Sequence, residues 1–166
     1  MNSDHDLAKR VQALEDRLDI LQLIMSYPLA LDSGAEKHCR SVWAETGVFD
    51  RGSGNPAEHS GGYQGSYGVE TIIEELNGSA IQEARNSGLA HLMTAPHVMI
   101  HGNKAVATNY NQLVEHGQNG FHTTRVTANR WELVRQNGRW LIERRILRLL
   151  SGPREAQQLL SQELAP

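Results

Sequence analysis

Apolar residues recur at intervals of three and four over the first thirty positions, which is the spacing of one face of an α-helix. This pattern predicts a helix over residues 4–32, ended by Ser33-Gly34. The apolar stripe is narrow in the first half of the helix and broad in the second half. We expect the broad half to pack on a core and the narrow half to serve an oligomer contact. The narrow stripe consists of Leu7, Val11, Leu14 and Leu18, and the broad part adds Ile20, Leu23 and Ile24.

Shorter elements follow this helix, and a stretch rich in glycine and serine separates them. Such a composition disfavours regular structure and predicts a long loop. The Asn77-Gly78 pair interrupts the helical pattern that comes after the loop. In chain order, the pattern predicts a helix over 35–45, a strand over 47–50, the loop over 51–68 and a helix over 69–85.

From His91 onward the helical spacing gives way to extended segments with branched apolar residues. Gln136-Asn137-Gly138 is a strong signal for a hairpin turn. Strands are predicted over 91–101, 105–115, 121–135 and 139–150, with a tail helix over 154–164. Helices followed by a four-stranded antiparallel meander indicate an α+β fold with the sheet curled over the helices. Because no repeat or linker divides the chain, we expect one domain over 1–166 with its core at about 8–150.

Composition excludes several functions for the 166-residue chain. The formal charge of −3 leaves no excess of basic residues to neutralise phosphates, so we expect no nucleic-acid partner. No apolar run approaches the ~20 residues that a membrane span requires, and the first residues lack a hydrophobic signal core. The single Cys39 excludes an intramolecular disulfide. We therefore expect a cytoplasmic protein with no membrane partner.

Three residues suggest acid–base chemistry: Tyr27 and Asp32 near the end of the first helix, and His91 at the start of the first strand. A carboxylate beside an imidazole in an apolar cavity makes a general acid/base pair without metal or cofactor. Simpler interpretations stay open, because Asp-Ser-Gly is good turn chemistry and a tyrosine can be a core aromatic. A metal site at His91, His97 and His101 is disfavoured, because Pro96 interrupts the strand and the spacing gives poor ligand geometry.

Further polar residues lie inside the predicted strands. Arg125 and Asn129 share their face with Phe121 and Trp131, since all four positions are odd and side chains alternate along a strand. Together with Asn111 they fit a pocket wall on which a few polar groups orient an apolar ligand. A solvent-facing surface with two stray aromatics fits equally well.

Several ordered motifs then resemble a known family. They are Tyr27-x4-Asp32-Ser-Gly, Trp43-Ala-Glu-x-Gly-Val-Phe-Asp50, His91-x2-Thr94, Ile100-x-Gly102-Asn103-x-Ala105 and Asn137-Gly138-Arg139-Trp140-x-Ile142-x2-Arg145. This set is similar to the SnoaL-like (polyketide cyclase and scytalone dehydratase-like) branch of the nuclear-transport-factor-two-like superfamily. The resemblance implies a cone-shaped, curved antiparallel sheet wrapped over the N-terminal helices, known as a cystatin-like roll. It also implies homo-oligomers, either dimers or trimers.

The resemblance assigns roles to residues. Asp32 and His91 match the acid/base pair of dehydratase-type members, and Tyr27 matches the oxyanion-hole tyrosine of ketosteroid isomerase. Asn111 stands near the position of a second histidine in scytalone dehydratase, and Asp50 is one position out of register for the isomerase. Both differences are departures from those two enzymes.

The function expected from these residues is that of a cofactor-independent lyase of the dehydratase type, acting on a small aromatic or cyclic substrate. His91 would be the base, Asp32 would orient it, and Tyr27 with Asn111 would bind an oxygen atom, while residues 51–68 would form a lid. Three alternatives remain open. They are an isomerase or cyclase of polycyclic ketones, a non-catalytic small-ligand-binding module, and the small subunit of a ring-hydroxylating dioxygenase.

Overall fold

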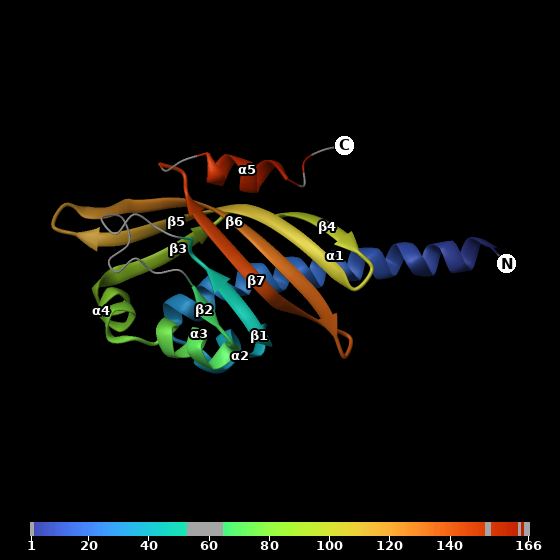
Figure 1. Cartoon of the computed structure of the whole chain (residues 1–166), viewed down its shortest axis with the longest axis horizontal. Helices are drawn as coiled ribbons and strands as arrows, with labels where there is room; N and C mark the ends of the chain where they lie inside the picture. The colour runs from blue at the N-terminus through green and yellow to red at the C-terminus, as the bar shows by residue number, and fades with distance from the viewer. Residues whose placement is uncertain (1, 53–64, 152–153, 163, 165–166) are drawn as a thin grey trace.

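A computed structural model describes residues 2–52, 65–151, 154–162 and 164 of the chain (Figure 1). Its mixed helices and curved, open sheet confirm the predicted α+β class. The helices are α1 (Asn2–Ser33), α2 (Glu36–Ser41), α3 (Val69–Leu76), α4 (Ser79–Gly88) and α5 (Glu155–Ser161). The strands are β1 (Trp43–Asp50), β2 (Ser66–Tyr67), β3 (Leu89–Met93), β4 (His97–His101), β5 (Lys104–Gly117), β6 (Gly120–Gln136) and β7 (Arg139–Leu149).

One seven-stranded sheet organises the fold. Its order is β2-β1-β7-β6-β5-β3, and β4 pairs with a second stretch of β5. The predicted antiparallel pairing of β5, β6 and β7 is confirmed. The turn between β6 and β7 has positive φ at both Asn137 (51°) and Gly138 (77°), as a tight hairpin with the sheet's twist requires.

The two faces of the sheet are covered by different helices. Figure 1 shows α1 crossing one face, with α2 and α3 beside it, and α5 lying over the other face. Successive residues of β6 alternate between these faces: Trp131 packs in the main core with α1, whereas Ala128 packs against Ala156 and Leu159 of α5. The main core therefore lies between α1 and the sheet.

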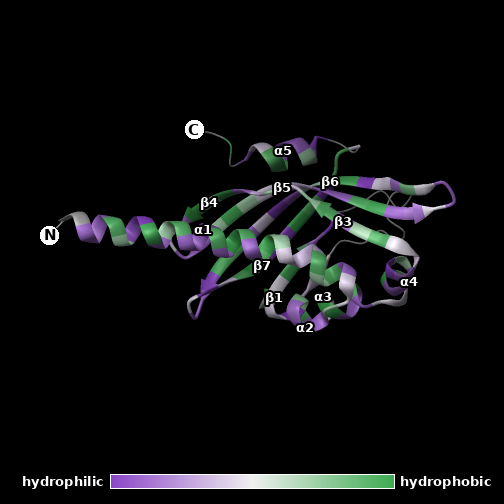
Figure 2. Ribbon diagram, turned by 180° about the vertical axis from the view of Figure 1, so that it is seen from behind, coloured by the Kyte–Doolittle hydropathy of each residue, from purple (hydrophilic) through white to green (hydrophobic). Residues whose placement is uncertain are grey.

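The two halves of α1 lie in different environments, and the second half packs on a core as its broad stripe predicts. In the second half, Ile20, Ile24 and Tyr27 are fully buried in the main core. In the first half, Leu7 and Leu14 remain about 60% exposed (58% and 63%). Both views show this first half projecting beyond the sheet (Figures 1 and 2). None of the described helices is long and apolar enough to cross a membrane.

Some predicted boundaries were wrong. The second helix ends at Ser41 rather than at residue 45, and Trp43 begins a strand that pairs in parallel with β7. The helix predicted over 69–85 is two helices, and the strand predicted over 91–101 is two strands on either side of Pro96. Proline lacks the N–H that a strand ladder needs, so β3 and β4 pair with different parts of β5. Of the predicted loop over 51–68, residues 53–64 lie outside the described residues.

Candidate active site

The structure brings together Asp32 and His91, which are 59 residues apart in sequence. Asp32 lies in the last turn of α1, and His91 lies on β3 opposite Leu113 of β5. The His91 Nδ1 atom is 2.6 Å from Asp32 Oδ1, and the His91 backbone N–H donates to Oδ2 at 2.7 Å. Both side chains are mostly buried, with exposures of 13% for His91 and 22% for Asp32. Two hydrogen bonds to one carboxylate therefore fix the position of the imidazole.

This geometry determines which ring nitrogen can react. Since a carboxylate is an acceptor only, the bond to Asp32 assigns the proton of neutral His91 to Nδ1. The lone pair is then on Nε2, and the side chain of His91 lines a cavity. A histidine oriented in this way can accept a proton, and the Asp32 carboxylate stabilises the imidazolium that results.

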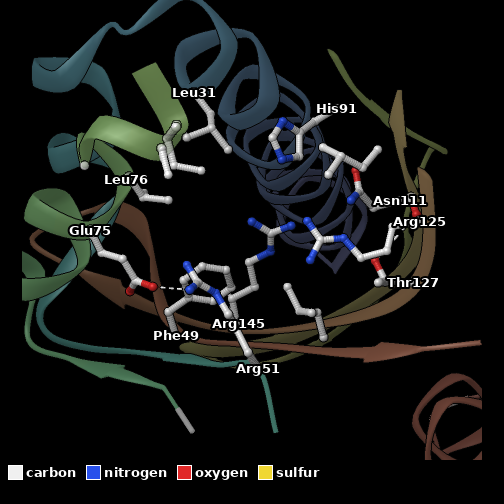
Figure 3. Close-up of a pocket in the computed structure, with 15 residues that line it drawn as sticks. Leu31, Phe49, Arg51, Glu75, Leu76, His91, Asn111, Arg125, Thr127 and Arg145 are labelled. Atoms are coloured by element: carbon white, nitrogen blue, oxygen red, sulfur yellow. Dashed lines mark hydrogen bonds and ion pairs between the residues drawn. The ribbon is translucent and has the colours of Figure 1, made fainter. Parts of the chain in front are cut away.

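The cavity next to His91 has a volume of about 400 Å³, near the lower end of the range for small-ligand sites. Its wall combines apolar and polar residues, which come from the helices on one side and the curved sheet on the other (Figure 3). The apolar part includes Leu31, Phe49, Leu76, Ile81, Leu113 and Leu147. A small ring compound fits a site of this size and character.

The predicted wall residues fall into two groups. Asn111 and Arg125 line the cavity. Asn129 and Trp131 share their face of β6, as predicted, but α1 and the curved sheet bury both completely and they do not line the cavity. Asn129 Oδ1 accepts hydrogen bonds from Arg145, and Trp131 Nε1 donates to Asn109 Oδ1 at 3.0 Å. These two residues support the wall from behind.

Tyr27 is also behind the wall. Its ring packs edge-on against Trp43 and Trp131, with centroids 6.1 and 5.6 Å away, and it does not line the cavity. The buried hydroxyl makes no hydrogen bond to any described residue. Burial raises the pKa of Tyr27, although the positive charge of Arg145 opposes this shift, so the phenol stays neutral near pH 7.

Two arginines that were not predicted as site residues also line the cavity. Arg145 is 2% exposed, and its guanidinium lies 4.5 Å from the ring centre of Trp131 and 5.0 Å from that of Tyr27. Arg51 lies over the Phe49 ring and forms an ion pair with Glu75. A signal for Arg145 was present, because adjacent arginines on a strand point to opposite faces and one of Arg144 and Arg145 must face the helices.

The cavity's polar groups are those of a proton-transfer or binding site. Within the described ranges, no three histidine, cysteine, aspartate or glutamate side chains come together in a way that would hold a metal ion. Thr127 adds a hydroxyl to the wall. The described wall therefore offers one histidine with a carboxylate behind it, an amide, a hydroxyl, the carboxylate of Glu75 and three guanidinium groups.

Comparisons with known proteins agree with this fold. The SnoaL-like domain family matches residues 12–146. An NTF2-like protein with a cystatin-like fold from Novosphingobium aromaticivorans is 29% identical, with a TM-score of 0.86 over 96% of this chain and 98% of that one. No protein of curated function matches in sequence.

Two further solved structures from the same organism share the fold at lower identity. A proposed aromatic ring hydroxylase is 24% identical, with a TM-score of 0.64 over 84% of this chain and 92% of that one. A proposed scytalone dehydratase is 13% identical, with a TM-score of 0.64 over 82% and 85%. The family match spans most of the sequence, and the structural neighbours carry the same roll. The chain therefore belongs to the SnoaL-like domain family, within the NTF2-like superfamily.

Proposed function

We propose that this protein is a cofactor-independent lyase that eliminates a leaving group from a small cyclic or aromatic compound. The observation that carries the proposal is the doubly hydrogen-bonded pair of Asp32 and His91 at the wall of a cavity of ligand size. The presence of a proposed scytalone dehydratase among the structural neighbours supports it at the level of the fold.

The proposed reaction begins when His91 Nε2 takes a proton from a carbon next to a carbonyl group. The electrons of the C–H bond form a carbon–carbon double bond, and the leaving group departs with its own bonding pair. The imidazolium, stabilised by Asp32, then returns the proton to the departing oxygen. Asn111 lines the same cavity and supplies an amide that can bind the carbonyl oxygen.

Tyr27 takes a different part in this proposal from the one its sequence position suggested. Because its hydroxyl lies behind the cavity wall, we assign it a positioning role through the guanidinium of Arg145, which lies over its ring. The same placement favours a lyase over an isomerase of polycyclic ketones, in which Tyr27 would be the main electrophile. We also propose that the protein forms a homo-oligomer through the exposed apolar stripe of α1.

The central step can be tested before the substrate is known. Small cyclic ketones are incubated with the protein in D₂O, and deuterium entry at the carbon next to the carbonyl is followed by NMR. We expect exchange with the wild type and a loss of roughly 10²- to 10⁴-fold in His91→Gln, the range typical of a removed general base.

A matched variant separates this effect from general damage. His97 lies on β4 with an exposed side chain and does not line the cavity, so His97→Gln is expected to exchange at the wild-type rate. Equal exchange rates in His91→Gln and the wild type would contradict the proposed role of His91.

A further inference from the structure

The charges of the cavity wall are unbalanced. Three arginines line it, Arg51, Arg125 and Arg145, and among the described lining residues Glu75 is the one carboxylate. Glu75 forms an ion pair with Arg51. The wall therefore presents two guanidinium groups that no carboxylate of the described residues neutralises through an ion pair.

Arg125 reaches the cavity through an irregularity in the sheet. Arg125 lies opposite Leu113, but the next pair is Thr123 with Val114, so Thr124 is an extra residue of β6. Such a bulge changes the direction of neighbouring side chains. Arg125 is half-buried and makes no hydrogen bond or ion pair with a described residue, and the charge of Glu115 acts on it only at a distance.

The other arginines of β6 and β7 have partners or contact water. Those of β6 and β7 that lie away from the cavity are paired with carboxylates: Arg130 with Glu132, Arg135 with Asp16, Arg144 with Asp50, and Arg148 with Asp50 and Glu155. Arg139, at the hairpin turn, is exposed to water. The other arginines of β6 and β7 are thus paired or exposed to water, whereas Arg125 and Arg145 face a cavity.

We propose that Arg125 and Arg145 form an anion-binding subsite that recognises a carboxylate group on the ring compound bound in this cavity. Figure 3 shows the two guanidinium groups pointing toward each other below the His91 ring. A carboxylate between them would accept hydrogen bonds from both. The rest of the ligand would then lie along the apolar wall, within reach of His91.

Energetics favour an anionic ligand over a neutral one. A cation removed from water is costly unless a counter-charge or hydrogen bonds compensate it. Burial lowers the pKa of both guanidinium groups, and the charge of Arg51 lowers both further. A carboxylate would offset this repulsion by Arg51, which a neutral amide of the same shape cannot do.

This inference rests on the proposed function only in placing the anion on the substrate of the His91 site, and its test needs no reaction. Benzoate and benzamide, which have the same shape and differ in charge, are titrated into the protein by NMR at millimolar concentration. We expect benzoate to bind the wild type roughly tenfold or more tightly, as charge-assisted hydrogen bonds imply. Arg125→Gln is expected to remove most of this preference by lowering benzoate affinity more than benzamide affinity.

Control variants make the result specific. Arg125→Lys keeps the charge without the planar fork and should retain part of the preference. Arg139→Gln, at the exposed turn, should retain all of it. A wild-type protein that shows the preference but no deuterium exchange would contradict the proposed reaction alone.

Three results would overturn the inference. They are equal binding of the two probes, no benzoate binding at millimolar concentration, and a preference that survives in a folded Arg125→Gln protein. Phenyl phosphate serves as a third probe, because a phosphate group has related chemistry. Tighter binding of phenyl phosphate than of benzoate would overturn the assignment of a carboxylate.

Discussion

The two polar parts of the cavity wall differ in how their groups are partnered. At the His91 part, the imidazole Nδ1 and the backbone N–H of His91 are both hydrogen-bonded to Asp32. At the arginine part, Arg125 and Arg145 form no ion pair with a described carboxylate. Under the two proposals, the group that must hold a precise orientation for proton transfer is fixed by the protein itself, whereas the groups that bind the ligand keep their strongest interaction for that ligand. The difference would then separate reaction chemistry from recognition.

The largest effect is expected from breaking the hydrogen-bonded pair of Asp32 and His91. Asp32→Asn keeps the size of the side chain but removes the charge that stabilises the His91 imidazolium. We expect deuterium exchange to fall by roughly a hundredfold or more, while the ratio of benzoate to benzamide affinity stays at its wild-type value. Exchange rates and NMR titrations on the same preparation measure both. An Asp32→Asn protein with the exchange rate of the wild type would mean that the carboxylate has only a structural role.

The next largest effect is expected at the arginine part of the cavity wall, from Arg145→Met. Benzoate affinity should fall roughly tenfold, because one of two charged donors is lost. The free energy of unfolding should fall by less than about 2 kcal/mol, because the cost of burying the cation disappears and offsets the lost hydrogen bonds to Asn129. Urea unfolding and benzoate titration test the two halves of this prediction. A loss of several kcal/mol in stability would instead identify Arg145 as a structural residue.

The His91 part of the cavity wall could be predicted from the sequence better than the arginine part. Helical and strand periodicities, together with a family resemblance, were enough to bring Asp32 and His91 together, because Asp32 lies in the last turn of α1, His91 lies on β3, and the fold determines where these two elements meet. Parity placed Trp131 and Arg125 on one face of β6, but it carries no information on sheet curvature. Parity also does not show the bulge at Thr124; in the curved sheet Arg125 lines the cavity and Trp131 is buried.

Local patterns also could not predict contacts made by distant strands. The parallel pairing of β1 with β7 extended a strand back to Trp43, where local spacing favours a helix. Such pairings depend on backbone hydrogen bonds between segments about 100 residues apart, for instance from the Ile142 N–H to the Val42 carbonyl oxygen. Tertiary contacts of this kind override local propensity.

A smaller effect on the cavity is expected from changing Asp16 of α1, a buried charge whose partners lie away from the cavity. Burial opposes ionisation of its carboxyl group, but hydrogen bonds from Arg135, Trp140 and Gln12 outweigh burial and lower the pKa of Asp16. Because its pKa is lowered, ionised Asp16 stabilises the fold at pH values above 3.8, the ordinary pKa of an aspartate side chain. This stabilisation is lost as the pH falls through the pKa that Asp16 has in the folded protein.

Asp16→Asn should therefore lower the free energy of unfolding at pH 7 by about 1–3 kcal/mol. The difference from the wild type should shrink in strongly acidic solution. Urea unfolding at both pH values measures it. Benzoate preference should not change, because Asp16 does not line the cavity. A stability difference that is independent of pH would show that the carboxylate's charge is not what stabilises this contact.

The smallest effect on either part of the cavity is expected from Leu14→Lys, in the first half of α1. Leu14 is 63% exposed, and this half of the helix projects beyond the sheet, far from the cavity that the second half helps to line (Figure 2). Exchange rate and benzoate preference should both equal those of the wild type.

If the apolar stripe joins copies of the chain, however, the charge should convert the oligomer into a monomer in sedimentation velocity, because a lysine cannot be buried in an apolar seam without a partner. A protein that keeps both the oligomer and the activity would place the contact between copies elsewhere on the molecule. A monomer that loses exchange or benzoate preference would show instead that the cavity depends on assembly.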